Sequence, residues 1–496
     1  MREATATQTS RREREGNSKS LRARIYRALE ATNERHMVRV HLTLDLEDPW
    51  ALMASPLLQG RQLAAWDAPE EDRCFLAVGV TRSRHPEGAG RFREAAALWE
   101  LLDRAMVELP SEVGGDIERE LPCLVSGFAF SATGSTRSEL WQGWGDSALW
   151  VPEILVQRHN GVTRAAITAA AGSSATPERV ADQIEAAAET LDALLRAARE
   201  PVSAPVIAGK NNMARVGRDA VAWEAWRDRV EAARSSMMDA PDASLQKVVL
   251  ARTERFQPIS AVSFDPLDTA LALRTRQSHC TTFCVRLPDG RAFVGATPEE
   301  LVRLEDREVT TMALAGTRSR GWDAANDEDL ARELLASGKD RREQSLVSDA
   351  IREALTPLVT ELDIPETPSV ARFTDVQHLK TEIRGHLKDG VNLFDLVERL
   401  HPTPAVGGLP RQEALAWLDA NEGLDRGWYA GPLGWVSPGG GGVFVVAIRS
   451  ALLRGGEAAA FAGCGLVERS DAKAEWQETI FKLRAISQGL ALSDAS

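Results

Sequence analysis

Two charged residues stand beside apolar segments, where an amine and a carboxyl can do acid–base chemistry. Lys247 lies in S-L-Q-K-V-V-L-A-R, and strand alternation puts it on one face with Val249 and Ala251. This lysine is either a strand-start residue whose amine reaches water or a desolvated general base with a lowered pKa. Glu299 follows the apolar run F-V-G-A-T-P. It either presents its carboxyl at the end of a buried strand or stands in the first turn of a helix that starts near Thr297.

Four carboxylates have the spacing of shared helix faces. Asp340 and Glu343 lie three residues apart on one predicted helix, and Glu475 and Glu478 lie three apart on another. If the two faces meet, their oxygens suit a hard cation such as Mg²⁺, whereas without a cation they need protons or basic neighbours. The alternative is two solvated faces, each with an i,i+4 pair between a glutamate and a lysine.

An arginine and three glycine-rich segments are candidate anion-binding features. Arg449 lies in the apolar segment V-F-V-V-A-I-R-S-A and needs an anion or polar partners, and its planar fork suits a carboxylate. Tyr429, one of 2 tyrosines, is either a core residue or a hydroxyl donor beside the same anion. The segments 315–321 and 462–466 either offer backbone N–H groups to an anion or make turns. The segment 437–444 lacks the Lys-Ser/Thr of a phosphate loop and predicts a hairpin turn.

The composition limits the class of protein. The chain has 496 residues, 44% of them hydrophobic, and a net charge of −13. These values predict a globular chain and argue against a nucleic-acid binder, which needs a basic face. The 5 cysteines do not indicate a disulfide framework in a chain of this length. We find no signal peptide and no apolar stretch near 18 residues, so we expect a cytoplasmic protein without a membrane partner.

The hydrophobic pattern predicts an α+β fold. Residues 1–20 read as a disordered basic tail, 37–170 read mostly as strands with turns, and a hairpin closes near 288–290. The portion 21–205 looks structural, whereas 240–490 holds the candidate site residues. Helices are predicted at 177–200, 218–238, 326–356 and 471–490.

The order of these motifs resembles that of the chorismate-utilising enzymes, which include isochorismate, salicylate, anthranilate and aminodeoxychorismate synthases. The first 200 residues match only loosely, through 66–69 and 127–130. The resemblance in the C-terminal 250 residues runs through K-V-V-L-A-R (247–252), F-V-G-A-T-P-E (293–299), A-L-A-G-T-R (313–318), K-D-R-R-E (339–343), V-Q-H-L-K-T (376–381), H-P-T-P-A-V-G-G-L-P (401–410), Y-A-G-P-L-G-W (429–435), V-A-I-R-S-A (446–451) and a final block at 462–482.

The resemblance implies a fold, a cofactor and a set of binding residues. The fold has large antiparallel β-sheets in a two-layer core flanked by helices, like anthranilate synthase component I, with 21–496 as a single chorismate-binding domain. Mg²⁺ is held by Glu343 and Glu478, with Glu475 and Asp340 nearby. The residues that the resemblance assigns to substrate are Gly316, Thr317, His378, Thr403, Tyr429, Arg449, Gly463, Gly465 and Lys482.

Within this family the resemblance is to the isochorismate synthase branch, of the menaquinone type. Water-using members carry lysine where Lys247 stands, and ammonia-using members typically carry glutamine. Neutral Lys247 then takes a proton from water as it attacks C2 of chorismate, while protonated Glu299 gives its proton to the departing C4 hydroxyl. Two departures from the family pattern are Gln344, where a histidine is usual, and the neutral segment 441–443.

Other functions remain open at this stage. The alternative enzyme is a salicylate synthase, which also expels pyruvate, and an ammonia-using synthase subunit or a chorismate-binding regulator without activity comes after it. No glutaminase segment is fused to the chain, so we expect no glutaminase subunit. The sequence leaves menaquinone and siderophore synthesis open as pathways, and we expect a monomer or a weak homodimer.

Overall fold

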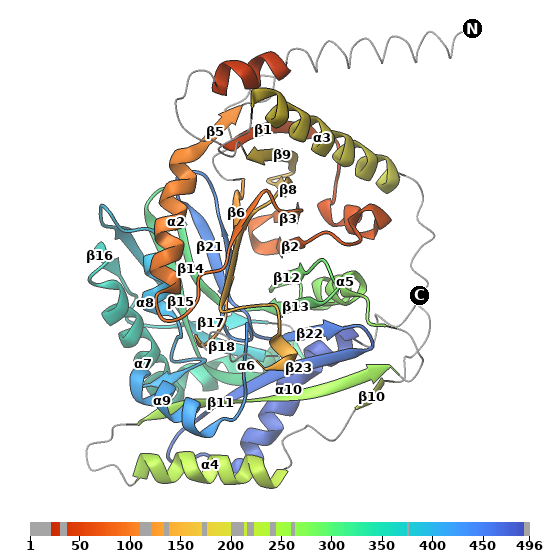
Figure 1. Cartoon of the computed structure of the whole chain (residues 1–496). Coiled ribbons are helices and arrows are strands. Elements are labelled where there is room, and N and C mark those ends of the chain that lie inside the picture. The colour runs from red at the N-terminus through yellow and green to blue at the C-terminus, as the bar shows by residue number, and fades with distance from the viewer. Residues whose placement is uncertain are drawn as a thin grey trace.

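Two large β-sheets, packed face to face, form the frame of the protein (Figure 1). The basic tail predicted at 1–20 lies outside the described residues. The computed structural model describes residues 21–29, 37–109, 121–132, 138–170, 176–199, 213–215, 223–238, 245–258, 263–373 and 376–490.

Strands from both halves of the chain build the larger sheet, which has 13 strands in the described residues. All neighbours are antiparallel except β1 and β5, which are parallel. In order across the sheet, the strands are β10 (Met213–Arg215), β11 (Lys247–Pro258), β23 (Glu457–Leu466), β22 (Ser450–Arg454), β13 (Ala292–Thr297), β12 (Thr281–Arg286), β2 (Leu63–Ala68), β3 (Arg73–Val78), β8 (Ile154–His159), β9 (Val162–Ala170), β1 (Met37–Leu44) and β5 (Met106–Leu109), with β19 (Gly408–Leu409) beside β11.

The smaller sheet is antiparallel throughout its 10 described strands. In order, these are β16 (Val359–Asp363), β18 (Val376–Leu387), β15 (Glu308–Ser319), β14 (Glu300–Glu305), β21 (Gly442–Val446), β20 (Pro432–Val436), β6 (Leu124–Phe128), β7 (Ser147–Val151) and β4 (Arg82–Arg84), with β17 (Ser369–Arg372) beside β18.

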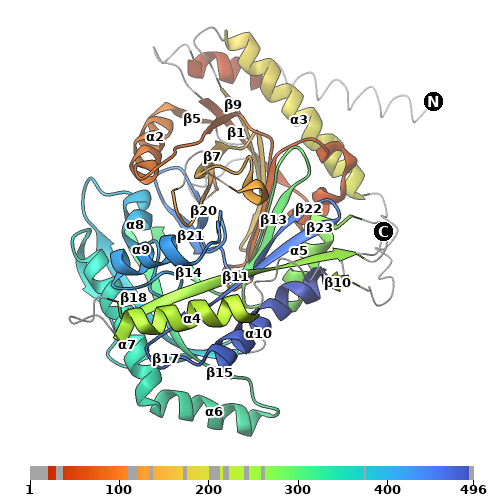
Figure 2. The ribbon, with the colours of Figure 1, turned by 60° about the horizontal axis from the view of Figure 1, so that its bottom comes forward.

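Helices cover the outer faces of the sheets. The helices α3, α5 and α10 pack on the larger sheet, and α6 and α7 pack on β15 and β18 of the smaller one. In both views α4, α7 and α10 lie around β11, in the lower half (Figures 1 and 2). The helices are α2 (Arg91–Ala105), α3 (Pro177–Arg199), α4 (Trp223–Met238), α5 (Pro266–Arg276), α6 (Ala324–Ala336), α7 (Gly338–Leu355), α8 (Leu393–Leu400), α9 (Arg411–Asn421) and α10 (Ala472–Leu490), with a helical segment at 21–29 and short 3₁₀ helices η1 (Pro49–Ala54), η2 (Pro56–Leu58), η3 (Pro69–Glu71) and η5 (Glu139–Trp141).

Alternate side chains of the strands fill two hydrophobic cores. Phe75 on β3 faces the smaller sheet, where it meets Trp435 edge to face with ring centroids 6.3 Å apart. Leu63 and Leu76 point to the opposite face, into a second core with α3, α5 and α10. This alternation confirms the predicted two-layer α+β fold with flanking helices.

Two predicted segments are corrected. The single helix predicted at 326–356 is wrong, because α6 ends at Ala336 and α7 starts at Gly338. The break lies at Ser337, whose backbone is extended. Its hydroxyl caps α7 by accepting a hydrogen bond from the backbone N–H of Asp340. The strand-rich region 37–170 also contains the helix α2, which the prediction lacked. Among the described helices, none is long and apolar enough to span a bilayer.

Candidate active site

Two of the candidate residues lie where the chain passes between the two sheets. Strand β13 of the larger sheet is followed directly by β14 of the smaller one, and Glu299 lies in this crossing. The chain crosses back between β21 and β22, and Arg449 lies in that second crossing. Backbone hydrogen bonds join the two crossings: Ala296 N–H donates to Arg449 O at 3.2 Å, and Val446 N–H donates to Glu299 O at 3.0 Å.

The crossings explain two differences from the sequence expectations. The alternative of a helix start near Thr297 is wrong, because strand β14 begins at Glu300. Arg449 was expected inside an apolar strand, but β21 ends at Val446 and Arg449 has φ +52. A residue with this left-handed backbone cannot continue a strand ladder, so the chain turns here.

The carboxyl of Glu299 lies in an environment that favours its protonated form near neutral pH. The Thr403 hydroxyl donates a hydrogen bond to Glu299 Oε1 at 3.2 Å. Burial raises the pKa of Glu299 to about 7, although Thr403 and the charges of Lys247, Lys482 and Arg449 act in the opposite direction. Glu299 is therefore placed to give up a proton at neutral pH.

The next residue points the other way. Glu300 pairs with Arg303, and both line a cavity of about 470 Å³ together with Glu71 and Arg73. None of the predicted site residues, all of which are described, lines this cavity. The extended crossing thus separates Glu299 from a second polar space.

The amine of Lys247 lies in an ion pair rather than in bulk water. Its Nζ is 2.9 Å from Glu343 Oε1, and the lysine side chain is 9% exposed. Gly465 on the neighbouring strand β23 makes room for this side chain, since a Cβ there would lie 2.8 Å from Lys247 Cε. The alternative of a lysine that reaches water from the strand start is wrong.

Two carboxylates on different helices each have a lysine partner. Burial alone raises the pKa of Glu343, but the charge and hydrogen bond of Lys247 outweigh burial, so this pKa lies below its usual value. On α10, Glu478 Oε1 pairs with Lys482 Nζ at 2.7 Å, which is the predicted i,i+4 pair. Lys482 also donates to the backbone O of Gly463 at 2.9 Å.

The other two predicted metal-site carboxylates have different surroundings. Asp340 is buried, and its Oδ2 is 3.1 Å from Arg318 Nη2. Burial raises the pKa of Glu475, the Ser470 hydroxyl opposes this, and the charge of Glu478 adds to it. Within the part of the chain that is described, no three carboxylate, histidine or cysteine side chains converge as a ready metal site.

The donor set nevertheless fits Mg²⁺ through Glu343 and Glu478. Mg²⁺ is usually bound by one or two carboxylates, with water and substrate oxygens completing the coordination. The charge of Lys482 acts on Glu343, and the same lysine pairs with Glu478, so one lysine lies within electrostatic range of both carboxylates. Each lysine pairs with Oε1 of its carboxylate, so the second oxygen of each carboxylate is not used by these pairs.

The helix that carries Glu343 is docked by its neighbour Gln344. The Gln344 amide Nε2 donates to the backbone O of Ala313 and to the Thr381 hydroxyl, both at 2.9 Å. The departure from the family histidine therefore still places a buried donor between α7 and the strands β15 and β18.

His378 faces Gly316, which lies at a β-bulge inside β15 and not in a turn, and its ring is neutral. Its Nδ1 is 2.9 Å from the backbone O of Gly316, and therefore carries the proton, and 3.1 Å from the Thr317 hydroxyl. Burial lowers the pKa of His378 to about 4, although the Gly316 hydrogen bond opposes this. Gly316 has φ +65, and a Cβ there would lie 2.9 Å from the Cβ of Asp340. Glycine is therefore required where the bulge of β15 packs against α7.

Tyr429 lies beside the other glycine segment. Its ring stacks on Phe461 with centroids 5.1 Å apart, and a Cβ at Gly463 would lie 3.3 Å from its hydroxyl. Burial raises the pKa of Tyr429, while the charges of Arg426 and Arg449 oppose this. The tyrosine thus keeps its hydroxyl proton as a hydrogen-bond donor.

Sequence reasoning missed a buried ion pair behind Lys247. Arg426 binds Glu422 through two hydrogen bonds of 2.6 and 2.7 Å. Glu422 Oε1 accepts from the backbone N–H of Ala251 at 2.7 Å, and Arg426 donates to the backbone O of Val249 at 2.5 Å and of Val406 at 2.9 Å. The only local signal for this pair was the i,i+4 spacing of opposite charges.

Comparisons with known proteins agree with the geometry. A family model described as chorismate binding enzyme matches residues 23–491. The salicylate biosynthesis isochorismate synthase of Pseudomonas aeruginosa is 39% identical over 430 residues, which cover 86% of this chain and 84% of that protein. The isochorismate synthase MenF of Bacillus subtilis is 29% identical over 427 residues, which cover 86% and 87%. The solved structure of MenF from Escherichia coli, a menaquinone-specific isochorismate synthase, shares the fold, with a TM-score of 0.74 at 23% identity over 95% of this chain and 100% of that one.

Proposed function

The chain belongs to the family of chorismate-binding enzymes, and on this premise we propose that it is an isochorismate synthase, an isomerase that converts chorismate to isochorismate. The observation that carries the proposal is that the chain has both a buried amine, Lys247, and a carboxyl, Glu299, with a pKa raised by burial to about 7. The charge of Lys247 lowers the pKa of Glu299, which supports a position of the amine within electrostatic range of this carboxyl. One accepts a proton and the other supplies one, as the isomerisation requires.

The proposed reaction adds one water molecule at C2 of chorismate and releases the C4 hydroxyl as another water molecule. Lys247 takes a proton from water as the water oxygen bonds to C2 of chorismate. Glu299 gives its proton to the C4 hydroxyl, which leaves as water, and the ring double bonds shift. Lys247 can act as the base only after its ammonium has released a proton to solvent and the amine has left Glu343, because an ammonium has no lone pair to accept a proton.

Mg²⁺ is the proposed cofactor, held by Glu343 and Glu478 with Glu475 and Asp340 nearby. When bound, the ion would supply positive charge that neutralises the ring carboxylate of chorismate. Taking Glu343 for the metal would also remove the partner of Lys247. In this proposal Asp340 lies near the ion but does not bind it directly, because its carboxylate already binds Arg318.

The remaining residues bind and orient the substrate in this proposal. Arg449, Tyr429 and Lys482 supply donors for carboxylate oxygens. Neutral His378, with its proton on Nδ1, positions the enolpyruvyl side of the substrate in this proposal and transfers no proton. Backbone groups and a hydroxyl complete the set at Gly316, Thr317, Thr403, Gly463 and Gly465.

A salicylate synthase is the second candidate, because it forms isochorismate before it expels pyruvate. The P. aeruginosa relative is named for isochorismate synthesis within salicylate biosynthesis, which agrees with isochorismate as the released product. The product would then serve menaquinone or siderophore synthesis. An ammonia-using activity is disfavoured by lysine at 247.

Product analysis tests the function. The protein is incubated with chorismate, with and without Mg²⁺ and with and without ammonium, and the products are separated by chromatography. We expect isochorismate only when Mg²⁺ is present, no dependence on ammonium, and no pyruvate. Stoichiometric pyruvate would identify a salicylate synthase, and an aminated product would contradict the proposal.

We further propose that residues 21–496 act as one unit. The support is that strands of 21–205, such as β2 and β6, pair with strands of 240–490 in both sheets. A cytoplasmic location, a monomer or weak homodimer and the lack of a glutaminase partner stay predictions.

A further inference from the structure

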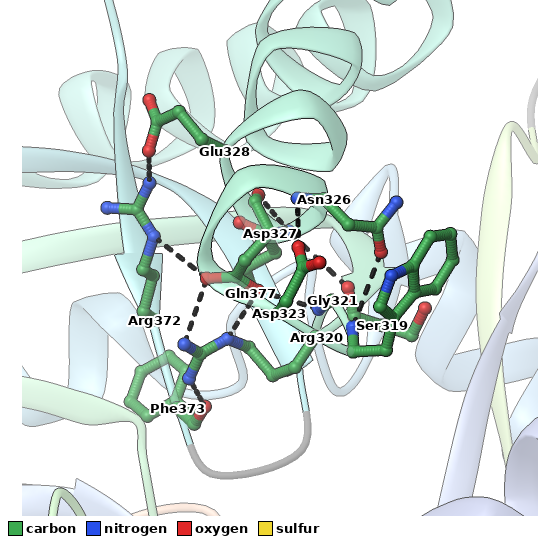
Figure 3. A network of polar contacts seen from close by, with 11 residues as sticks. Ser319, Arg320, Gly321, Asp323, Asn326, Asp327, Glu328, Arg372, Phe373 and Gln377 are labelled. Atoms are coloured by element: carbon green, nitrogen blue, oxygen red, sulfur yellow. Dashed lines mark hydrogen bonds and ion pairs between the residues drawn. The ribbon is translucent and has the colours of Figure 1, made fainter.

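A buried carboxylate on α6 binds the end of strand β15. Arg320 donates to Asp327 through two hydrogen bonds, Nε to Oδ1 at 2.8 Å and Nη2 to Oδ2 at 2.9 Å. The backbone N–H of Gly321 also donates to Oδ1, at 2.7 Å (Figure 3). The Arg320 hydrogen bonds and this N–H lower the pKa of Asp327 to about 2, so the carboxylate is charged at neutral pH.

Arg320 and the backbone oxygen of Asp327 link this ion pair to the neighbouring strand β18. Arg320 Nη1 donates to the backbone O of Phe373 at 2.6 Å, just before β18 begins. The buried amide of Gln377 donates to the backbone O of Ser319 and of Asp327, both at 3.4 Å. Asp327 therefore ties together the end of β15, the start of β18 and the first turn of α6 (Figure 3).

Both tied segments carry proposed substrate-binding groups. Gly316 and Thr317 lie on β15 four and three residues before Arg320, and His378 follows Gln377 directly. The ring of Phe373 lies 5.7 Å from the ring of His378. Phe373 and Arg449 also line the same small cavity. A shift of these segments would move the His378 ring and the Gly316–Thr317 bulge together.

Charges around Asp327 come from each packed element. Arg320 directly follows β15, and Arg372 Nε, from β17, lies 3.4 Å from Oδ2. Glu328, next on α6, pairs instead with Arg372 Nη2 at 2.6 Å on the exposed side. Asp323 caps α6 by accepting from the backbone N–H of Asn326. Asp327 is thus the acidic residue that binds Arg320, whereas Glu328 binds Arg372 on the exposed side.

We propose that Asp327 is a positioning residue, which through Arg320 holds the Gly316–Thr317 bulge of β15 and His378 in the geometry that binds chorismate. This inference rests on the proposed function. Asp327 touches no substrate, and its effect passes through the register of β15 and β18. Its loss should weaken substrate binding more than it slows chemistry, because the proposed base and acid lie on other segments.

The test compares Asp327→Asn with Glu328→Gln, which removes the same charge one residue away and leaves Arg320 untouched. Steady-state kinetics on chorismate with Mg²⁺ should show KM raised about 10-fold in Asp327→Asn, with kcat within about 2-fold of the original. Glu328→Gln should leave both values unchanged. The pair Asp327→Asn and Arg320→Gln should give little more loss together than either gives alone, because both break one contact.

Hydrogen exchange gives a readout that needs no turnover. Peptides covering 314–321 and 376–380 should exchange faster in Asp327→Asn than in Glu328→Gln, while peptides of β11 stay the same. Unchanged exchange in these peptides, or faster exchange with an unchanged KM, overturns the inference. If the unsubstituted enzyme does not convert chorismate, the proposed function fails by itself, and exchange alone decides whether Asp327 orders these segments.

Discussion

Lys247 combines two properties that conflict in a general base. Its amine is buried, which a base needs, but it is paired with Glu343, which keeps it from accepting a proton. The two properties become compatible if Glu343 binds a metal ion instead of Lys247 and the lysine has released its proton. The residue thus links proton transfer to cofactor binding in the proposed mechanism.

Replacing this amine should stop the reaction without unfolding the protein. Lys247→Gln keeps a polar side chain of similar length beside Gly465 and removes the proton acceptor. We expect turnover to fall by about 10²- to 10⁴-fold, with the unfolding temperature little changed. The exposed Lys473→Gln on α10 is the matched control. Full activity of Lys247→Gln would remove lysine from the role of base.

Glu299 should set the alkaline limb of the pH profile. A proton donor with a pKa raised to about 7 is protonated below that pH and loses its proton above it. We therefore expect kcat/KM to fall as pH rises through about 7, measured from about pH 5.5 to about pH 8.5.

Substitution checks the assignment of this limb. Glu299→Gln should abolish turnover, whereas Glu300→Gln, which faces Arg303, should keep the pH profile. An alkaline limb that stays in place in an active Glu299→Gln variant would show that another group donates the proton.

At the scale of elements, the ion pair between Glu422 and Arg426 holds the strand that carries the base. Arg426 connects β11 to the segment before β19 through backbone oxygens of Val249 and Val406. Both side chains are almost fully buried, at 3% and 4% exposure. Removing one partner leaves the other charge buried and unpaired.

Arg426→Gln should therefore destabilise the protein by about 3–5 kcal/mol, measured by chemical unfolding. The exposed pair of Arg332 and Asp329 provides a control, since Arg332→Gln should cost no more than about 1 kcal/mol. Equal losses from the two substitutions would mean that the buried pair adds nothing special to stability.

Local patterns predicted most elements, but failed where two signals overlapped. The hairpin of β12 and β13 and the helices α3, α4 and α10 follow from local turn residues and helical spacing. Helices α6 and α7 share one continuous helical pattern, so the single cap at Ser337 was missed. Helix α2 was missed although Phe92, Ala95, Trp99 and Leu102 form its buried stripe.

At the scale of the whole molecule, the site is a product of topology. Glu299 and Arg449 belong to segments 150 residues apart that cross between the sheets at adjacent points. Motif order identified these residues, because the family resemblance carried the arrangement that spacing alone lacks. Asp327 escaped notice because its partners lie outside α6, and Glu422 and Arg426 escaped notice because their i,i+4 spacing was the only local mark of a buried pair.

The most direct test of the account follows the oxygen atoms. Chorismate is converted in ¹⁸O-labelled water with Mg²⁺, and the isochorismate formed is analysed by mass spectrometry. Attack of water at C2 with loss of the C4 hydroxyl predicts one ¹⁸O atom in each product molecule, on C2. Isochorismate without the label would mean that the original hydroxyl migrates, and the proposed roles of Lys247 and Glu299 would then be wrong.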